Sequence, residues 1–505
     1  MISFVDSFLN RITMYRLVLY YLLVLLGAAA LFGFVGILPY NPATLVFSTL
    51  LIVGACWVTN IAFAKGFGAA TNVESVYITA LILALIITPV ASTDYIGIGF
   101  LIFASVWAMS SKYILAIGKK HVFNPAAFGI ALAALTINQS ATWWVGGNLA
   151  MLPLVFLGGL LIVRKIHRFD LVWSFAAVAL GATVLTSPSV GSLTPITQTL
   201  LHSPFFFLAF VMLTEPLTMP PNWWLRVIYG SIVGFLFAPN IHIGSFYLTP
   251  ELALLAGNIF AYLVSPKGRF MLKLIERNKL ANGVYEFVFA SDRPFGFRPG
   301  QYLEWTLGHK FADNRGNRRY FTIASSPTED TVRVGVKFYE PMSTFKRALM
   351  AMRVNDTISA SHLAGDFVLP RDQEKKLVFI AGGIGVTPFR SMAQYLIDEK
   401  EKRSAVLFYS NKTAAEVAYK DVFDRAAREV GLKTVYALTN EASPVPGMHQ
   451  GPVDGALIAQ EVPDYKERTF YISGPRGMVE AFKKTLHDMG VPRWHVKTDY
   501  FPGFA

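Results

Sequence analysis

Ten apolar stretches, each long enough to form a helix, follow one another in the first 265 residues. A bilayer core about 30 Å thick requires roughly 20 residues of helix, and these stretches are of that order. They occupy residues 16–38, 43–64, 75–91, 95–117, 123–138, 146–164, 170–187, 203–218, 223–239 and 249–265. The sequence therefore predicts a polytopic α-helical membrane domain of about ten helices over residues 1–266, embedded in a lipid bilayer.

The positive charge is distributed unevenly along the chain. Only ten of the 45 Lys and Arg residues precede residue 267, and they lie at the N-terminus or in every second connection between the apolar stretches. Cytoplasmic loops carry such an excess of Lys and Arg. We expect a multi-pass protein of a prokaryotic cytoplasmic membrane, with both termini and residues 267–505 in the cytoplasm. No basic stripe interleaved with aromatic residues indicates nucleic-acid binding.

The apolar half contains two pairs of similar segments. "LALIITPVAS" (83–92) resembles "LAFVMLTEPLTMPP" (208–221), and "FNPAAFGIAL" (123–132) resembles "LTPELALLAG" (248–257). The members of each pair are five helices apart, so they would cross the membrane in opposite directions. This pattern predicts a 5+5 inverted repeat, whose interrupted helices build a polar site near the midplane.

Four polar residues fall where these helices are interrupted: Asn124, Thr214, Glu215 and Thr218. Ionisable and polar groups inside a membrane are candidates for function by default. The alternative interpretation is that they cap helix ends.

Short alternating segments replace the apolar stretches after the boundary. They are "VYEFVFA" (284–290), "GQYLEWTL" (300–307), "RRYFTIAS" (318–325) and "VRVGVKFY" (332–339), separated by turn residues. Alternation of apolar and polar residues predicts an antiparallel β-barrel over residues 267–372.

From residue 376 the pattern changes to strand followed by helix, as in "KLVFIAGGIGVTPFRSMAQYLI". This alternation predicts a parallel α/β domain over residues 373–505.

The strand "RRYFTIASSP" (318–327) carries the Arg-x-aromatic-Ser/Thr pattern on Arg319, Phe321 and Thr322. With "EPMSTFKRAL" (340–349), it makes residues 268–505 resemble the ferredoxin–NADP reductase superfamily, a flavin-binding barrel followed by a nicotinamide-binding domain. The resemblance implies that Arg319 binds the FAD pyrophosphate, Phe321 covers the isoalloxazine and the Thr322 hydroxyl lies at flavin N5. Ser343 and neighbouring amides would bind the other phosphate.

Three later segments are similar to the nicotinamide half of the same superfamily: "AGGIGVTPFRSM" (381–392), "SGPRGMV" (473–479) and "DYFPGF" (499–504). The glycines let backbone amides approach a diphosphate, and Thr387 with Pro388 would cap the following helix. The resemblance implies catalytic roles for Thr322, Ser473 and Asp499 and a flavin-covering ring at Phe504. The implied NAD(P) residues are Gly382, Gly383, Gly385, Thr387, Pro388, Gly474, Pro475 and Met478.

The membrane half also resembles a family. "GKKHVFNPAAFGIAL" (118–132), "NVESVYITALILALIITP" (72–89) and "LAFVMLTEPLTMPP" are similar to segments of the D subunit of Rnf complexes and the B subunit of the sodium-pumping NADH:quinone oxidoreductase. That family carries FMN on a threonine, for which Thr142 in "TINQSATWW" (136–144) is the nearest match. Thr136 and Gln139 depart from the family pattern, so a non-covalent second flavin, FMN or riboflavin, is favoured.

The sequence thus predicts a membrane flavoprotein oxidoreductase that takes hydride from cytosolic NADH or NADPH onto FAD. Electrons would pass to a flavin in the membrane domain and on to a quinone or an extracytoplasmic acceptor. Ser410 and Lys412 could meet a 2′-phosphate, and both nucleotides stay compatible with the sequence. No metal site is predicted.

Two other functions are compatible with the same pattern. One is a redox-driven or redox-regulated transporter of an ion or small molecule. The other is a haem-type ferric reductase, against which the absence of spaced histidine pairs in the apolar stretches counts.

Overall fold

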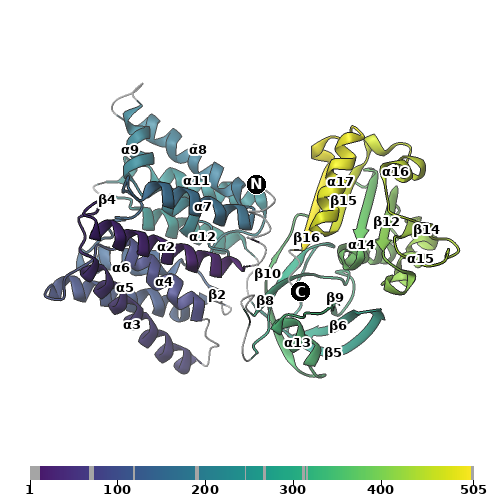
Figure 1. Cartoon of the computed structure of the whole chain (residues 1–505), viewed down its shortest axis with the longest axis horizontal. Helices are drawn as coiled ribbons and strands as arrows, with labels where there is room; N and C mark the ends of the chain where they lie inside the picture. The colour runs from purple at the N-terminus through teal and green to yellow at the C-terminus, as the bar shows by residue number, and fades with distance from the viewer. Residues whose placement is uncertain are drawn as a thin grey trace. The chain divides into compact units, whose positions relative to one another are not determined.

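The computed structural model describes residues 9, 12–67, 73–117, 120–187, 193–244, 246–265, 269–309, 313 and 317–501. The chain divides into two compact units, Met1–Gly268 and Arg269–Ala505. Figure 1 distinguishes a helical N-terminal unit from a C-terminal unit that contains the long strands. Each unit has its own buried apolar core.

The N-terminal unit is built almost entirely of helices, because its apolar stretches leave few alternating polar positions that would favour strands. Every predicted apolar stretch overlaps at least one helix. Its helices are α2 (Met14–Phe34), α3 (Pro42–Phe67), α4 (Val73–Ile86), α5 (Tyr95–Ile114), α6 (Pro125–Ile137), α7 (Leu152–Ile166), α8 (Phe169–Thr186), α9 (Thr194–His202), α10 (Phe205–Phe207), the π-helical turn η1 (Leu208–Met212), α11 (Trp223–Phe237) and α12 (Pro250–Val264).

Four of these helices, α2, α3, α5 and α8, are long and apolar enough to cross a membrane. A fifth span results if α9 and the segment Phe205–Met212, which meet at 61°, are counted together. The helices α4, α6, α11 and α12 are apolar but shorter. Proline accounts for two of the shorter lengths, since α4 ends three residues before Pro89 and α6 begins at Pro125.

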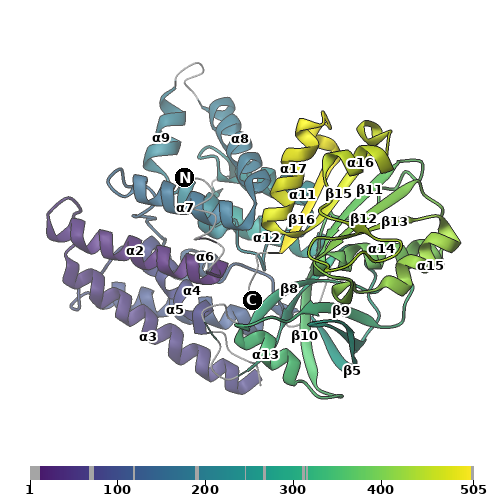
Figure 2. The ribbon, with the colours of Figure 1, turned by 45° about the vertical axis from the view of Figure 1, so that its right-hand side comes forward.

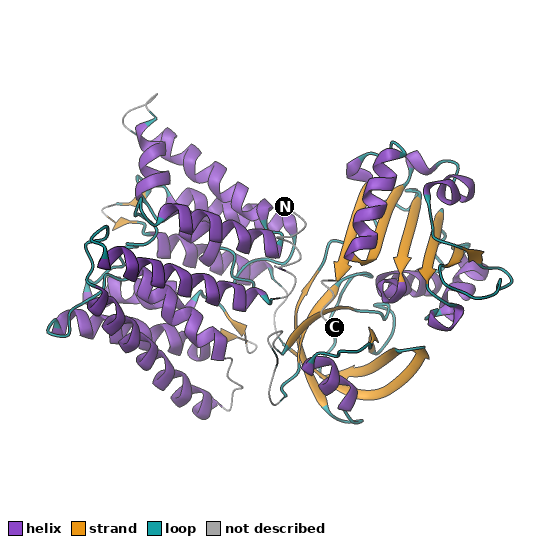
Figure 3. Ribbon diagram, viewed as in Figure 1, coloured by secondary structure: helices purple, strands orange, loops and turns teal. Residues whose placement is uncertain are grey.

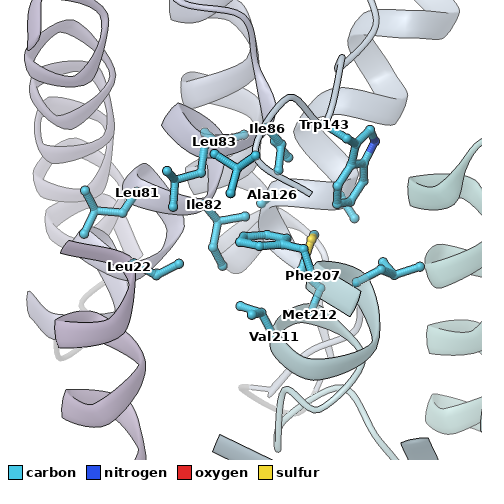
Figure 4. Packing of buried hydrophobic residues seen from close by; sticks show 14 of the residues in the cluster. Leu22, Leu81, Ile82, Leu83, Ile86, Ala126, Trp143, Phe207, Val211 and Met212 are labelled. Atoms are coloured by element: carbon cyan, nitrogen blue, oxygen red, sulfur yellow. The ribbon is translucent and has the colours of Figure 1, made fainter. Parts of the chain in front are cut away.

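The core of the helical unit joins segments that are distant in the sequence. Figure 4 shows Leu22 of α2 and Leu83 of α4 in the same cluster as Phe207 of α10 and Met212 of η1, and all four side chains are fully buried. Close approaches accompany this packing: a Cβ on Gly158 would lie 2.2 Å from the Tyr21 ring. Small residues at such crossings let helix backbones come near each other.

Two short antiparallel ladders occur at corresponding places in the helical unit. The first pairs β1 (Ala116–Ile117) with β2 (Lys120–His121), just before α6. The second pairs β3 (His242–Ile243) with β4 (Phe246–Tyr247), just before α12. Each of these two helices has proline at its first position, a position at which the missing amide hydrogen costs nothing.

The first part of the C-terminal unit is a curled antiparallel sheet, as the alternating segments predict. Its strands are β5 (Phe270–Ala281), β6 (Val284–Ser291), β7 (Tyr302–Thr306), β8 (Arg318–Thr322), β9 (Val332–Lys337) and β10 (Thr357–Ala364), with helix α13 (Thr344–Ala351). The strand order is β8-β7-β10-β5-β6-β9. The backbone amide of Ala324 donates to the carbonyl of Arg333 at 2.8 Å, which joins the two outer strands at one end.

The second part is a parallel sheet with helices on both faces, as predicted from the alternation of strand and helix (Figures 2 and 3). Its strands, in spatial order, are β14 (His449–Gln450), β13 (Lys433–Leu438), β12 (Ala405–Asn411), β11 (Leu377–Gly382), β15 (Thr469–Pro475) and β16 (Val496–Phe501). Helices α14 (Thr387–Asp398) and α15 (Lys420–Val430) pack on one face. Helices α16 (Gly455–Glu461) and α17 (Arg476–Asp488) pack on the other.

The crossing of α8 and α11 yields a testable prediction. A Cβ on Gly234 of α11 would lie 2.5 Å from the carbonyl oxygen of Phe175, whereas one on Gly181 of α8 would meet no atom within 4 Å. Gly234→Ala should destabilise the helical unit by about 1–3 kcal/mol, because the backbones must separate. Gly181→Ala, the matched control, should be neutral or stabilising by about 0.5–1 kcal/mol. Thermal unfolding in detergent measures both, and equal effects would contradict the close crossing.

Candidate functional site

Strand β8 places the residues of the Arg-x-aromatic-Thr pattern at different depths. Arg319 and Thr322 are buried, Phe321 is half-buried and Tyr320 is 46% exposed. The Phe321 ring lies between two other aromatic rings, with centroids 6.4 Å from Trp305 and 6.0 Å from Phe345. The strand therefore offers a partly open ring between two buried polar side chains.

The hydroxyl of Thr322 is buried and makes no hydrogen bond to the part of the chain that the structure describes. The hydroxyl of Ser473, at the end of β15, is buried and unbonded in the same sense. Leaving a buried hydroxyl unsatisfied costs about 1–3 kcal/mol. Two such hydroxyls, both at positions where the sequence predicts a flavin–nicotinamide site, fit a bound polar ring system.

Arg319 lies beside the N-terminus of α13. Its guanidinium carbon is 5.0 Å from the centroid of the Phe345 ring, and Phe345 is the second residue of that helix. Ser343 is the N-cap, and its hydroxyl accepts a hydrogen bond from the Lys346 amide at 3.2 Å. A cation next to a helix N-terminus favours an anion such as a pyrophosphate. Arg319 and Ser343, which the sequence predicted as phosphate ligands, are thus brought to one place.

Asp313, which no sequence pattern predicted, also reaches this helix N-terminus. Its carboxylate accepts a hydrogen bond from the Thr344 amide at 3.0 Å, and its own amide donates to the Thr344 hydroxyl at 3.0 Å. A carboxylate is favoured at a helix N-terminus, where unpaired amides and the helix dipole attract negative charge. One of the amides predicted to bind phosphate therefore already has a protein partner.

The nicotinamide residues gather where the order of the parallel strands reverses. The neighbours β11 and β15 lie at this switch point, where ligands of α/β sheets bind beyond the carboxyl ends of the strands. Gly383 follows β11 with φ of +52° and open space around its Cβ position. A Cβ on Gly382 would lie 2.3 Å from the Met478 sulfur, and one on Gly385 would lie 2.4 Å from the Ser473 carbonyl oxygen. Only Gly383 therefore leaves its backbone open to a ligand, and the other two glycines allow close packing.

Ser473 and Asp499 are paired positions on adjacent parallel strands. Asp499 is half-buried, and burial raises the pKa of its carboxyl from 3.8 to about 6. Gly474 and Pro475 continue β15 into α17. The structure thus brings two of the three predicted catalytic residues together, while Phe504 lies outside the described residues.

Thr387 does not cap α14, and this part of the prediction was wrong. It is the first residue of the helix, and its hydroxyl donates to the carbonyl of Ile384 at 3.2 Å. The preceding residues 383–386 form a 3₁₀ turn, so the chain enters the helix already coiled and needs no side-chain cap. Pro388 is buried near the helix start, where proline is well tolerated.

Sequence reasoning missed Arg390 and Ser391, one turn after Thr387. The Arg390 guanidinium binds the Glu329 carboxylate through two nitrogens, and the Ser391 hydroxyl donates to the Ser325 carbonyl at 2.6 Å. Nothing in their spacing distinguishes them, since α14 also carries the buried polar residues Thr387 and Gln394. Arg390 and Ser391 connect α14 to the segment that follows β8.

A second polar cluster lies in the helical unit and contains three of the predicted residues. The Asn124 side-chain amide donates to Glu215 at 2.9 Å, and the Thr218 hydroxyl donates to the same carboxylate oxygen at 3.2 Å. His121 Nε2 is 3.4 Å from the other carboxylate oxygen. The side-chain oxygen Oδ1 of Asn258 accepts a hydrogen bond from the Asn124 backbone amide at 2.8 Å. His121 and Asn258 were not predicted.

The two remaining predicted residues have other partners. Thr214 donates its hydroxyl to the Phe210 carbonyl one turn earlier, at 2.7 Å. The Thr142 hydroxyl is 2.8 Å from the Thr88 hydroxyl, next to the interruption that follows α4. Asn124 also caps α6, since its side-chain oxygen accepts from the Ala127 amide. Asn124 therefore has two roles: its side-chain oxygen caps α6, and its side-chain nitrogen binds Glu215.

The raised pKa of Asp499 predicts a pH-dependent stability. Between pH 3.8 and about 6 the folded chain retains a proton that the unfolded chain has lost, so the free energy of unfolding falls as pH rises, by up to about 3 kcal/mol. Asp499→Asn should match the wild type near pH 4 and be more stable at pH 7. Unfolding midpoints of the C-terminal unit measure the difference, with Asp292→Asn on an exposed turn as the control. A stability difference that is the same at both pH values would contradict the burial of this carboxyl.

Comparison with known proteins agrees with this arrangement. Residues 379–484 match the family model described as "Oxidoreductase NAD-binding domain". The chain is 25% identical to a flavohemoprotein of Oceanobacillus iheyensis over 238 residues and 26% identical to one of Pseudomonas putida over 239 residues. These alignments cover 45% and 46% of the chain and 58% and 59% of the relatives, so the chain spans little more than half the length of each.

A solved structure titled as the cytochrome b5 reductase domain of Ulva prolifera nitrate reductase aligns with a TM-score of 0.42 and 21% identity. The alignment covers 47% of this chain and 98% of the chain in that structure. By its family match, the C-terminal unit of the chain contains an oxidoreductase NAD-binding domain.

Proposed function

We propose that the chain is a membrane flavoprotein that takes hydride from cytosolic NADH or NADPH onto FAD. Electrons then pass to a second flavin in the helical unit and on to a quinone or an extracytoplasmic acceptor. The observation that carries the proposal is the pair of buried hydroxyls of Thr322 and Ser473, neither of which forms a hydrogen bond to a residue that the structure describes. They lie at the ends of β8 and β15, where a flavin and a nicotinamide ring would each meet one hydroxyl.

Each residue of the C-terminal site has a separable role. Arg319 and the N-terminus of α13 bind the FAD pyrophosphate, and Phe321 covers the flavin ring. The Thr322 hydroxyl would bond the flavin at the edge where hydride arrives, and Ser473, on β15 of the parallel sheet, would orient the nicotinamide. Gly383 offers its backbone to the NAD(P)H diphosphate. Bound FAD supplies a two-electron acceptor that can release electrons one at a time.

The proposed second flavin, FMN or riboflavin, lies in a ten-helix membrane domain with a 5+5 inverted repeat. Two features support the repeat: a short ladder before α6 and another before α12, each followed by a helix that begins with proline. The Asn124–Glu215–Thr218 cluster supplies polar groups for a flavin ring, and Thr142 with Thr214 completes the candidate set. The π-helical turn η1 ends shortly before Glu215, and such turns are frequent at functional sites.

A redox-coupled transporter is the second candidate, and Glu251 favours it. This carboxyl lies in the first turn of α12, is 1% exposed and accepts a hydrogen bond from Trp143 Nε1 at 3.2 Å. The half-buried Glu215 carboxylate in the same unit likewise accepts side-chain hydrogen bonds, from Asn124 and Thr218. Carboxyls inside a helical membrane unit occur along ion and proton pathways.

Two substitutions in β8 test the assignment of roles. Arg319→Ala removes a charge-assisted contact worth about 1.5–3 kcal/mol and should weaken FAD retention by about one to two orders of magnitude. Thr322→Val keeps the shape of the side chain and should retain FAD while slowing its reduction. FAD content after purification and the rate of flavin bleaching with NADH or NADPH measure the two effects. Equal loss of FAD in both variants would show that the roles are not divided in this way.

Sealed vesicles with the C-terminal unit outside test the transmembrane route. NADH or NADPH is added outside, and reduction of an impermeant acceptor trapped in the lumen is followed. Glu215→Leu should abolish lumenal reduction and leave reduction of an external dye unchanged, since the hydride site lies in the other unit. If the wild type reduces external dye, but neither a quinone nor the trapped acceptor, and contains one flavin per chain, the proposed electron route is absent and the transporter is favoured.

A further inference from the structure

A row of charged side chains with alternating sign crosses the C-terminal unit from β6 to α14. Glu286 of β6 is buried, and its carboxylate accepts from the Arg333 guanidinium at 2.8 Å. Arg333 of β9 also lies 3.1 Å from Glu329. Glu329 then binds Arg390 of α14, which is 6% exposed, through both carboxylate oxygens. The two acids and two bases balance one another within this row.

Hydrogen bonds connect this row to residues 324 and 325, shortly after Thr322. Arg390 Nη1 donates to the carbonyl of Ala324 at 3.1 Å, and the Ser391 hydroxyl donates to the carbonyl of Ser325 at 2.6 Å. From the other side, the Arg333 amide donates to the Ser325 hydroxyl at 3.1 Å. Residues 324 and 325 are therefore held by α14 and by β9 at once.

Helix α14 directly follows the glycine turn, residues 383–386, that is proposed to bind the nicotinamide nucleotide. Thr387 and Arg390 are three residues apart on α14, so their side chains lie on one face of it. A Cβ on Gly335 of β9 would lie 2.9 Å from the Thr387 methyl carbon and 2.7 Å from the Tyr419 hydroxyl. The helix thus meets β9 with no space for an intervening side chain.

From these contacts we infer that Arg390 is a positioning residue: it fixes the distance between the nicotinamide-binding helix and the flavin-binding strand. The inference rests on the proposed hydride transfer from NAD(P)H to FAD. A bidentate guanidinium–carboxylate pair sets orientation as well as distance. Hydride transfer requires the reacting atoms within about 3–3.5 Å, so a shift of 1 Å costs on the order of 100-fold in rate.

The test uses the full-length protein in detergent and stopped-flow reduction of FAD. Arg390→Gln should lower the limiting rate of flavin reduction about 10- to 100-fold. The Kd for NADH or NADPH and the FAD content should stay within about threefold of the wild type, because Arg390 touches neither site. The kinetic isotope effect with NADH deuterated at C4 should rise, since transfer becomes slower than binding. Arg390→Lys keeps the positive charge but loses the two-nitrogen contact of the guanidinium. Its limiting rate of flavin reduction should lie between those of the wild type and Arg390→Gln.

Lys337→Gln is the matched control, since Lys337 and Glu416 form another ion pair between β9 and the parallel-sheet part, at 2.6 Å. It should leave the limiting rate and the isotope effect unchanged. An Arg390→Gln variant that melts earlier but transfers hydride at the wild-type rate would overturn the inference. If that variant does not fold, Glu329→Gln decides by the same readouts. Absence of flavin reduction in the wild type would instead reject the proposed function itself.

Discussion

The candidate reductase site depends on the approach of two backbones at the switch point of the parallel sheet. The turn after β11 comes so close to the end of β15 that a Cβ on Gly385 would lie 2.4 Å from the Ser473 carbonyl oxygen. The two backbones can approach this closely only because residue 385 is a glycine and has no side chain. Their contact fixes the turn that precedes Thr387 against the strand that carries Ser473. This contact places Gly383 and Thr387 beside Ser473, which is paired in turn with Asp499 on the next strand.

The fold of the C-terminal unit could be predicted because its signals are local. Alternating segments predict the curled antiparallel sheet, and strand–helix alternation predicts the parallel one. The Arg390–Glu329 pair could not be predicted, since it joins residues 61 positions apart and neither belongs to a spaced pattern. Thr387 was misjudged for a different reason. The 3₁₀ turn before it depends on tertiary packing of Gly385, which removes the need for a helix cap.

In the helical unit, apolar length indicated where helices form better than where they end. The prolines that shorten α4 and α6 are visible in the sequence, yet a window of mean hydropathy extends across them. Asn124, Glu215 and Thr218 were recognised as polar residues at interruptions. His121 and Asn258 were not, because each is a single polar residue whose importance depends on a partner far along the chain. Buried polar groups are paired as a rule, so one member of a cluster predicts that partners exist but not which residues they are.

The close helix crossings have a consequence for any charge that enters the helical unit. A Cβ on Gly129 of α6 would lie 2.4 Å from the Ala104 carbonyl oxygen, and the α8–α11 crossing at Gly234 has the same character. Backbones in direct contact cannot adjust by changing a rotamer, so they move only together. The Glu215 carboxylate, and the Asn124 amide and Thr218 hydroxyl that bind it, therefore lie in a rigid packing of helices with their hydrogen bonds already formed. Dipoles held in this way respond to a new charge with little reorganisation, and this lowers the barrier for a charge to arrive or leave.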